Sequence, residues 1–120
     1  MALSVLLVDD DPMFRWLATQ ILGDLGAEVV GSAANAAEAI SAANAVRPDA
    51  VLVDVGLPDR DGVSLAYELA ALPWRPRVVL TSSDNDASAA IKPASPGDRL
   101  EFVPKAQLPS APLRSLLAGD

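Results

Sequence analysis

The sequence predicts an α/β domain built around a parallel β-sheet, and three observations support this fold class. The chain has 120 residues, which is the size of one compact domain. Short apolar runs alternate along it with longer segments of helical periodicity. Two of the apolar runs stop abruptly at carboxylates, as buried parallel strands often do. Because of this chain length, we expect residues 1–120 to form one domain with no separate output domain, and 51% hydrophobic residues are enough for its core.

The first expected unit is a strand, an acidic turn and a helix. Leu3–Val8 is a continuous apolar run that stops at Asp9-Asp10-Asp11, and Pro12 suits the first turn of a helix. Gly26 is a suitable residue to end that helix. The spacing of its apolar residues predicts a buried stripe of Met13, Leu17 and Ile21, with Phe14, Ala18 and Leu25 alongside.

Two further strand–helix units follow. A short strand is expected at Glu28–Gly31, and an alanine-rich helix at Ala36–Val46 that ends before Arg47-Pro48. The next strand, Ala50–Val53, leads to Asp54 and a turn-rich segment over residues 56–62, before a helix from about Val63 to Ala71. The apolar faces of the two helices are Ala36, Ala39, Ile40 and Ala43 in one, and Leu65, Leu69 and Leu72 in the other.

The last part of the chain has weaker signals. Val78–Leu80 reads as a strand followed by Thr81-Ser82-Ser83. Residues 84–99 contain Pro93 and Pro96, so a fourth helix there is expected to be short or disrupted. Leu100–Val103 reads as a fifth strand ahead of Lys105, and residues 113–118 as a closing helix.

Composition excludes several kinds of chemistry. The net charge of −7 disfavours direct binding to nucleic acid, because such binding relies on cationic side chains. The absence of cysteine and histidine removes thiolate and imidazole chemistry, so a bound metal must be a hard cation held by oxygen atoms. No apolar run is long enough to cross a membrane, and the N-terminus does not resemble a signal peptide. We therefore expect a cytoplasmic protein without a membrane partner.

Polar residues follow four of the predicted strands. Because ligands of parallel sheets bind at the carboxyl ends of strands, we expect Asp9, Asp10, Asp54, Thr81 and Lys105 to meet at one edge. Three carboxylates at one edge repel each other unless a cation lies among them, and Mg²⁺ or Mn²⁺ suits such ligands. A carboxylate in this position can act as a nucleophile toward a phosphoryl group, with the lysine and the threonine hydroxyl contacting its oxygens.

Each of these residues also has a simpler explanation. Asp9, Asp10 and Asp11 could stabilise a helix N-terminus, and Asp54 could cap the turn before Pro58. Asp11 is expected to have only this helix-start role, and Asp61-Gly62 only a role in turn formation. Thr81 alone could be an ordinary strand-end hydroxyl, Lys105 a solvated lysine and Phe102 a core aromatic. Their joint occurrence after successive strands favours a functional site.

Four segments carry a resemblance to a known family, namely Val5–Pro12, Val51–Gly62, Val78–Ser82 and Phe102–Lys105. In this order and spacing they resemble the receiver domain of bacterial two-component response regulators. The resemblance implies a doubly wound sheet of five parallel strands in the order 2-1-3-4-5, with helices on both faces. It also implies a role for each matching residue. Asp54 would be the phosphoacceptor, and it would bind the metal together with Asp9, Asp10 and the main-chain carbonyl of Gly56. Thr81 and Lys105 would contact the phosphoryl group, and Phe102 would be a switch aromatic.

The function implied by the resemblance is that of a phosphoacceptor in a phosphorelay. A histidine kinase or a histidine phosphotransfer protein would phosphorylate Asp54, and phosphorylation would change binding to an unidentified downstream protein. Such a domain accepts a phosphoryl group and can lose it again, but it is not a turnover enzyme. Two alternatives are an interaction module with this fold that signals without phosphorylation, and the receiver portion of a longer DNA-binding response regulator.

Overall fold

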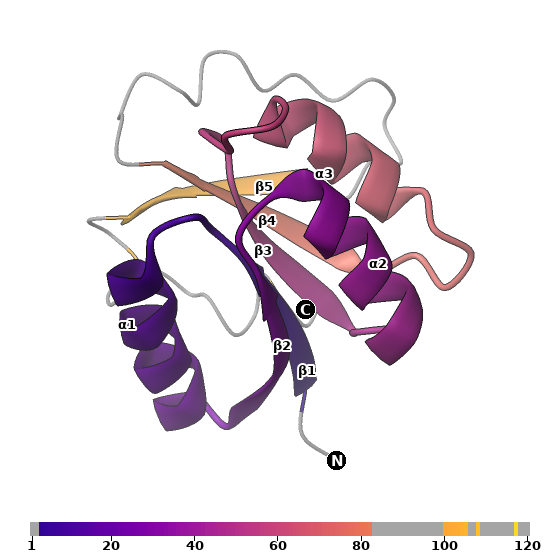
Figure 1. Cartoon of the computed structure of the whole chain (residues 1–120). Helices are drawn as coiled ribbons and strands as arrows, with labels where there is room; N and C mark the ends of the chain where they lie inside the picture. The colour runs from indigo at the N-terminus through magenta and orange to yellow at the C-terminus, as the bar shows by residue number, and fades with distance from the viewer. Residues whose placement is uncertain (1–2, 83–99, 106–107, 109–116, 118–120) are drawn as a thin grey trace.

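A computed structural model describes residues 3–82, 100–105, 108 and 117 of the chain (Figure 1). In chain order, its elements are β1 (Leu3–Val8), α1 (Pro12–Asp24), β2 (Ala27–Ala33), α2 (Ala36–Val46), β3 (Ala50–Asp54), α3 (Gly62–Ala70), β4 (Arg77–Ser82) and β5 (Leu100–Pro104). The expected fourth helix and most of the closing helix fall outside the described residues. None of the helices described is a candidate for crossing a membrane.

The five strands form one parallel sheet in the order β2-β1-β3-β4-β5, which confirms the predicted fold class and strand order. The central strands β1, β3 and β4 consist largely of buried valine and leucine, as strands covered on both faces require. β2 is longer than the predicted Glu28–Gly31. Its small and polar end, Gly31–Ala33, continues the pairing with β1 after an irregularity in register between Val5 and Leu6.

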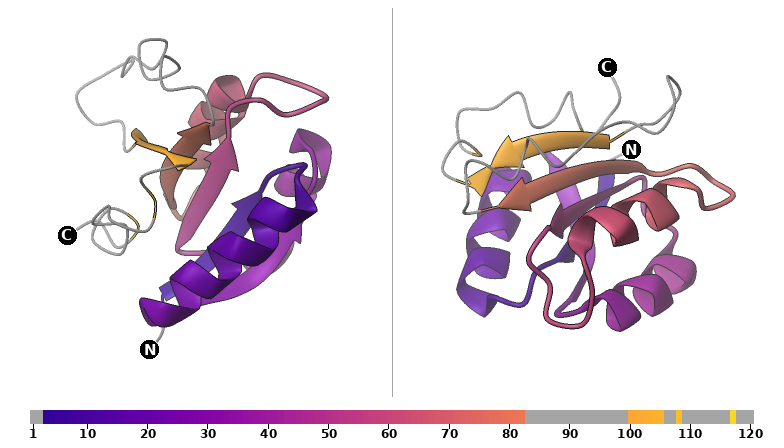
Figure 2. Two further views of the ribbon diagram at one scale, coloured as in Figure 1. Left: turned by 90° about the vertical axis from the view of Figure 1, so that its left-hand side faces the viewer. Right: turned by 90° about the horizontal axis from the view of Figure 1, so that it is seen from above.

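Helices cover both faces of the sheet, as the views in Figures 1 and 2 show. α2 and α3 pack on one face, around Leu6, Val51 and Leu80. α1 packs on the other face, where Val5, Leu52 and Val79 form a second core cluster with the buried Leu108 and Leu117. Because successive side chains of a strand point to opposite faces, neighbouring residues of each strand contribute to different clusters.

The buried stripe of α1 differs from the predicted one. Ala18 and Leu22 are fully buried, whereas Met13 and Leu17 are 71% and 47% exposed. The helix carries apolar side chains on two faces, and the contact with the sheet selects the one that Ala18 and Leu22 occupy. The prediction that Met13 and Leu17 are buried is therefore wrong, and α1 presents both to solvent.

Side-chain caps explain where the helices begin. Asp11 precedes α1 and accepts a hydrogen bond from Met13 N, and Asn35 does the same for α2 with Glu38 N. Asp61 precedes α3 and accepts from Val63 N. Gly26, with φ of +82°, follows α1 and confirms its predicted end. Asp11 thus has the helix-start role expected for it.

Candidate functional site

The carboxyl ends of the strands bring the predicted polar residues to one edge of the sheet. Asp9 directly follows β1, Asp54 is the last residue of β3, and Lys105 directly follows β5. Thr81 lies in β4, in register with Asp54. Because β1 and β4 flank β3, the strand order itself places these residues side by side.

Three carboxylates meet at this edge. Asp9, Asp10 and Asp54 each offer an oxygen atom, and these three atoms lie within 4.8 Å of one another. Asp9 and Asp54 are buried, with exposed fractions of 2% and 9%, whereas Asp10 is exposed. Like charges this close repel strongly when they are screened from water, so the cluster attracts a cation.

Asp9 is held firmly in this cluster. Its Oδ1 accepts a hydrogen bond of 2.8 Å from Asp11 N, and its backbone carbonyl accepts one from the Arg15 guanidinium. Its Oδ2 lies 2.7 Å from Lys105 Nζ. This second contact is a short, charge-assisted ion pair, and Lys105 is the only partner of the buried Oδ2 among the described residues.

The environment of Asp54 disfavours its ionised form. Burial is the largest cause of its raised pKa, and the negative charge of Asp9 adds to it. Lys105, whose Nζ lies 3.8 Å from Asp54 Oδ1, and a hydrogen bond from the Gly56 backbone act in the opposite direction. The net result is a carboxyl group whose charge is only partly compensated by the protein.

These residues fit a hard divalent cation. Mg²⁺ prefers oxygen ligands and is usually held by one or two carboxylates together with water and phosphate oxygens. The cluster supplies one oxygen each from the buried Asp9 and Asp54 and from the exposed Asp10, all within 4.8 Å of one another. When bound, such an ion would neutralise the acidic cluster and stabilise negative charge on a transferring phosphoryl group.

The other predicted site residues have different surroundings. The hydroxyl of Thr81 is buried, and Oγ1 has no hydrogen-bond partner among the residues described. Gly56 is exposed in the loop after β3, two residues beyond Asp54. Phe102 lies in β5, the strand next to β4, and is partly buried against the core cluster beneath α2 and α3. It therefore has the position of a core aromatic near the site.

Gly62 is a residue of the site that the sequence interpretation missed. A Cβ atom at this position would lie 2.2 Å from the backbone oxygen of Asp54 and 2.6 Å from the Cα of Val55. The Gly62 N–H also donates to the Val55 carbonyl. Only glycine lets α3 start this close to the backbone of Asp54, so Gly62 has a role in packing as well as in the turn. The Asp61-Gly62 pair is a visible turn signal in the sequence, but the sequence does not reveal that Gly62 packs against the backbone of Asp54.

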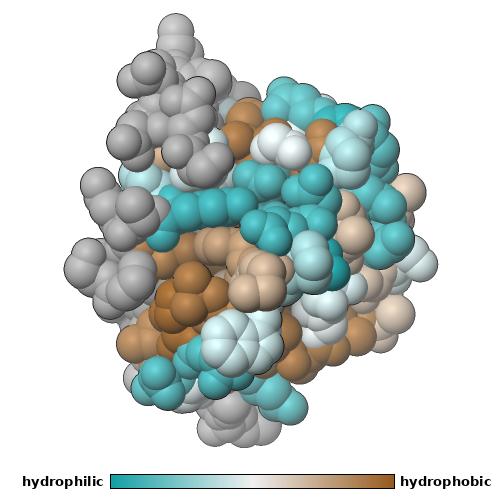
Figure 3. Space-filling view, turned by 60° about the vertical axis from the view of Figure 1, so that its left-hand side comes forward, coloured by the Kyte–Doolittle hydropathy of each residue, from teal (hydrophilic) through white to brown (hydrophobic). Residues whose placement is uncertain are grey.

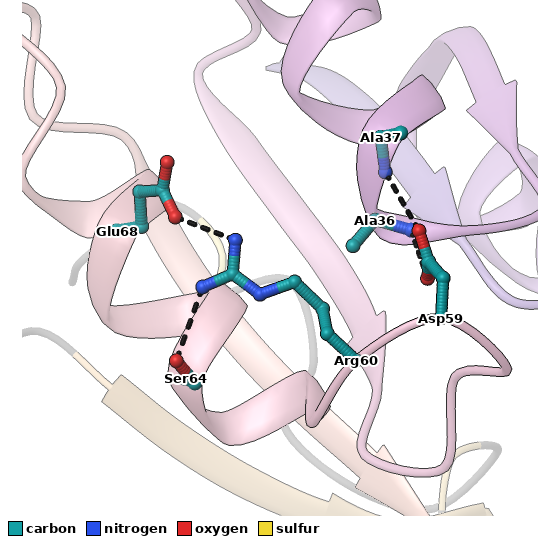
Figure 4. A network of polar contacts seen from close by, with 6 residues as sticks. All are labelled: Ala36, Ala37, Asp59, Arg60, Ser64 and Glu68. Atoms are coloured by element: carbon teal, nitrogen blue, oxygen red, sulfur yellow. Dashed lines mark hydrogen bonds and ion pairs between the residues drawn. The ribbon is translucent and has the colours of Figure 1, made fainter.

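Two neighbouring residues of the loop between β3 and α3 tie it to two different helices, α2 and α3 (Figure 4). Asp59 accepts hydrogen bonds from Ala36 N and Ala37 N, at 2.8 and 3.1 Å, and so adds a second cap to α2. These bonds, that from Ala36 above all, lower the pKa of Asp59. Arg60 reaches in the other direction to Glu68 and Ser64 of α3. Both contacts hold the loop that carries Gly56.

Comparison with known proteins identifies the family. A family profile described as the response regulator receiver domain matches residues 5–109, and the chain belongs to this family. It is 33% identical over 106 residues to a protein-glutamate methylesterase/protein-glutamine glutaminase of Vibrio parahaemolyticus, covering 88% of this chain and 29% of that protein. It is 31% identical over 122 residues to the transcriptional regulatory protein PdtaR of Mycobacterium tuberculosis, covering 95% of this chain and 60% of that one.

The structural comparison agrees. A two-component response regulator of the LuxR family from Aurantimonas superimposes with a TM-score of 0.81 at 26% identity, over 99% of this chain and 87% of the other. The chain spans less than two thirds of the length of both curated relatives named above. What the matches share with this chain is the receiver domain.

Proposed function

We propose that this chain accepts a phosphoryl group on Asp54 from a phosphohistidine protein, with Mg²⁺ or Mn²⁺ bound by Asp9, Asp10, Asp54 and the Gly56 carbonyl. The observation that carries the proposal is the meeting of these three carboxylates with Lys105 at one strand edge. As a member of the receiver family, the chain belongs to two-component signalling. Its site is the one place in the described residues where three potential carboxylate ligands cluster.

The chemistry assigns a task to each residue. An oxygen of Asp54 attacks the phosphorus atom, a P–O bond forms, the P–N bond of the donor breaks, and the imidazole is the leaving group. Lys105 is within reach of the Asp54 carboxylate and would contact an oxygen of the bound phosphoryl group. The buried hydroxyl of Thr81 would donate a hydrogen bond that it does not make to the residues described. A shift of Thr81 and Phe102 would then change binding to a downstream protein in the cytoplasm.

Phosphorylation can be tested with a small donor. Wild-type protein is incubated with acetyl phosphate and MgCl₂, and intact mass spectrometry measures the addition of one phosphoryl group. We expect the addition in wild type, its loss in Asp54→Asn, and its loss when EDTA replaces MgCl₂. If wild type gains no phosphoryl group, or if Asp54→Asn gains as much as wild type, the proposal is wrong.

The donor protein is expected to dock on α1. This helix begins directly after the acidic residues and exposes Met13, Trp16 and Leu17. A groove of about 370 Å³ lies beside it, lined by Arg15, Trp16 and Thr19 together with residues 29–32 of β2. On this side of the molecule hydrophobic side chains gather next to a hydrophilic band (Figure 3). An exposed apolar patch beside a reactive residue suits a transient protein partner.

Docking and chemistry can be separated by comparing two donors. Trp16→Ala should slow phosphotransfer from a histidine kinase that phosphorylates the wild-type chain, and leave phosphorylation by acetyl phosphate unchanged. Val46→Ala is a matched control, because Val46 is also an exposed apolar residue but ends α2, away from the site. Equal kinase rates for Trp16→Ala and wild type would contradict docking on α1.

The relatives suggest one further possibility for the natural protein. Because both curated relatives named above are considerably longer than this chain, the sequence could act as the receiver portion of a longer regulator, as the PdtaR match suggests. The reading frame of the gene decides this. The acceptance of a phosphoryl group on Asp54 is proposed in either case.

A further inference from the structure

The ammonium group of Lys105 lies over an aromatic ring. Its Nζ is 4.2 Å from the centroid of the Phe14 ring, 2.7 Å from Asp9 Oδ2 and 3.8 Å from Asp54 Oδ1. The side chain of Lys105 is only 19% exposed. The ring centroid is well within the distance of about 6 Å at which a cation is attracted to an aromatic face. Lys105 is therefore held from two sides, by a carboxylate and by the ring.

The position of the Phe14 ring is set by the fold. Phe14 is in the first turn of α1, which Asp11 caps, and it packs partly buried against the core cluster that includes Ala18 and Leu22. The same helix supplies Arg15, which binds the Asp9 carbonyl. The ring and the Asp9 backbone are thus held by one rigid element, α1, and the Lys105 ammonium lies close to the ring and to the Asp9 carboxylate.

This arrangement creates a competition for one oxygen atom. Asp9 Oδ2 is buried, and the Lys105 ammonium, 2.7 Å away, is its only partner among the described residues. A divalent cation bound by Asp9 would need to displace the ammonium from this oxygen, because two cations cannot share it closely without strong repulsion. Any contact that holds Lys105 at Asp9 therefore weakens cation binding.

We propose that Phe14 is a positioning residue of this site: its ring holds Lys105 against Asp9 in the metal-free protein and so lowers the affinity for Mg²⁺. This inference rests on the metal site in the proposed function above. Through Phe14, α1 would thus help to determine the Mg²⁺ concentration at which the site becomes occupied. Release of Lys105 from the ring would free its ammonium for the phosphoryl group.

The test measures Mg²⁺ affinity and the position of Lys105 separately. NMR titrations with MgCl₂ at constant pH and ionic strength give the Kd for wild type, Phe14→Leu and Phe14→Tyr. Loss of a cation–π contact at a partly exposed site corresponds to about a two- to fivefold tighter Kd for Phe14→Leu. Phe14→Tyr keeps the aromatic face and should bind Mg²⁺ like wild type. In the metal-free protein, the ε-methylene protons of Lys105 should show an upfield ring-current shift in wild type and Phe14→Tyr, and lose it in Phe14→Leu.

A double-mutant cycle shows whether Phe14 acts through Lys105. Lys105→Met keeps the length of the side chain without the charge, and it should tighten Mg²⁺ binding by itself. Adding Phe14→Leu to Lys105→Met should then leave the Kd unchanged. Circular dichroism and thermal melting of each variant verify that it is folded.

The outcomes separate this inference from the proposed function. If wild type binds no Mg²⁺, the metal site itself is wrong and the inference falls with it. If wild type binds Mg²⁺ but Phe14→Leu has the same or a weaker affinity, the inference alone is wrong. It is also wrong if Phe14→Leu changes the Kd equally with and without Lys105, because Phe14 would then act through packing.

Discussion

The contact of Gly62 with the backbone of Asp54 leads to a prediction about stability. Helix propensity alone favours alanine over glycine by about 1 kcal/mol, and Gly62 is the first residue of α3 with no positive φ. The structure predicts the opposite sign. A Cβ at Gly62 would meet backbone atoms at 2.2 and 2.6 Å, whereas ordinary contact begins at 3.4 Å. Backbone atoms cannot rotate away as a flexible side chain can, so α3 or the end of β3 must move.

The size of the effect follows from the cost of overpacking. Inserting a methyl group into a packed site costs about 1–3 kcal/mol, and the backbone contacts at Gly62 place Gly62→Ala toward the upper end. After the gain in helix propensity is subtracted, we expect a net loss of about 2 kcal/mol in the free energy of unfolding. For a domain of this size, that lowers Tm by about 8 °C.

Gly23→Ala is the matched control for this prediction. Gly23 lies in the last turn of α1, and a Cβ there would meet nothing within 4 Å. The same substitution should therefore stabilise the protein, by up to about 1 kcal/mol. Urea denaturation of wild type and both variants measures the difference. The reasoning is refuted if Gly62→Ala is as stable as wild type, or if the two variants change stability in the same direction.

Three further predictions follow from the charges around the site. Asp54→Asn should raise Tm at pH 7 in EDTA, because the raised pKa of Asp54 means that its ionised form opposes folding. Melting curves should show this gain disappearing below the ordinary pKa of 3.8, where the acid is neutral in both the folded and the unfolded protein. Asp59→Ala should lower Tm at pH 7, and the loss should shrink as the pH falls through the lowered pKa of Asp59; an equal loss at all pH values would contradict its role as a charged cap. Arg60→Ala removes a partly exposed ion pair with Glu68 and should cost no more than about 0.5 kcal/mol in urea denaturation.

Much of the fold could be predicted from the sequence because buried parallel strands have a distinctive pattern. The strands around Val5, Val51 and Val78 lie where the apolar runs predict them. The edge with Asp9 and Asp54 follows from one rule about strand ends. Strand boundaries were less predictable. In β2, pairing with β1 extends the strand beyond the predicted Glu28–Gly31 to Ala27 at one end and to Ser32 and Ala33 at the other, residues that are not typical of strands.

Contacts between distant segments explain what could not be predicted. The sequence of α1 offers two apolar faces, and only packing against the sheet distinguishes the buried Leu22 from the exposed Leu17. Asp59 looks like a turn residue, but it caps a helix that begins 23 positions earlier in the chain. The proximity of Phe14 to Lys105 likewise depends on how α1 and β5 are placed.

The negative charge of the chain has two structural uses at this one edge. Asp11, Asp59 and Asp61 accept hydrogen bonds from helix N-termini, where the helix dipole favours negative charge. Asp9 and Asp54 instead lie close together in a buried cluster, and burial raises the pKa of Asp54. The first group stabilises the fold, whereas Asp54 opposes it when ionised. Because binding a cation would relieve this repulsion only in the folded state, it would also stabilise the fold. The repulsion among the buried carboxylates, which costs stability in the metal-free protein, therefore favours binding of the cation.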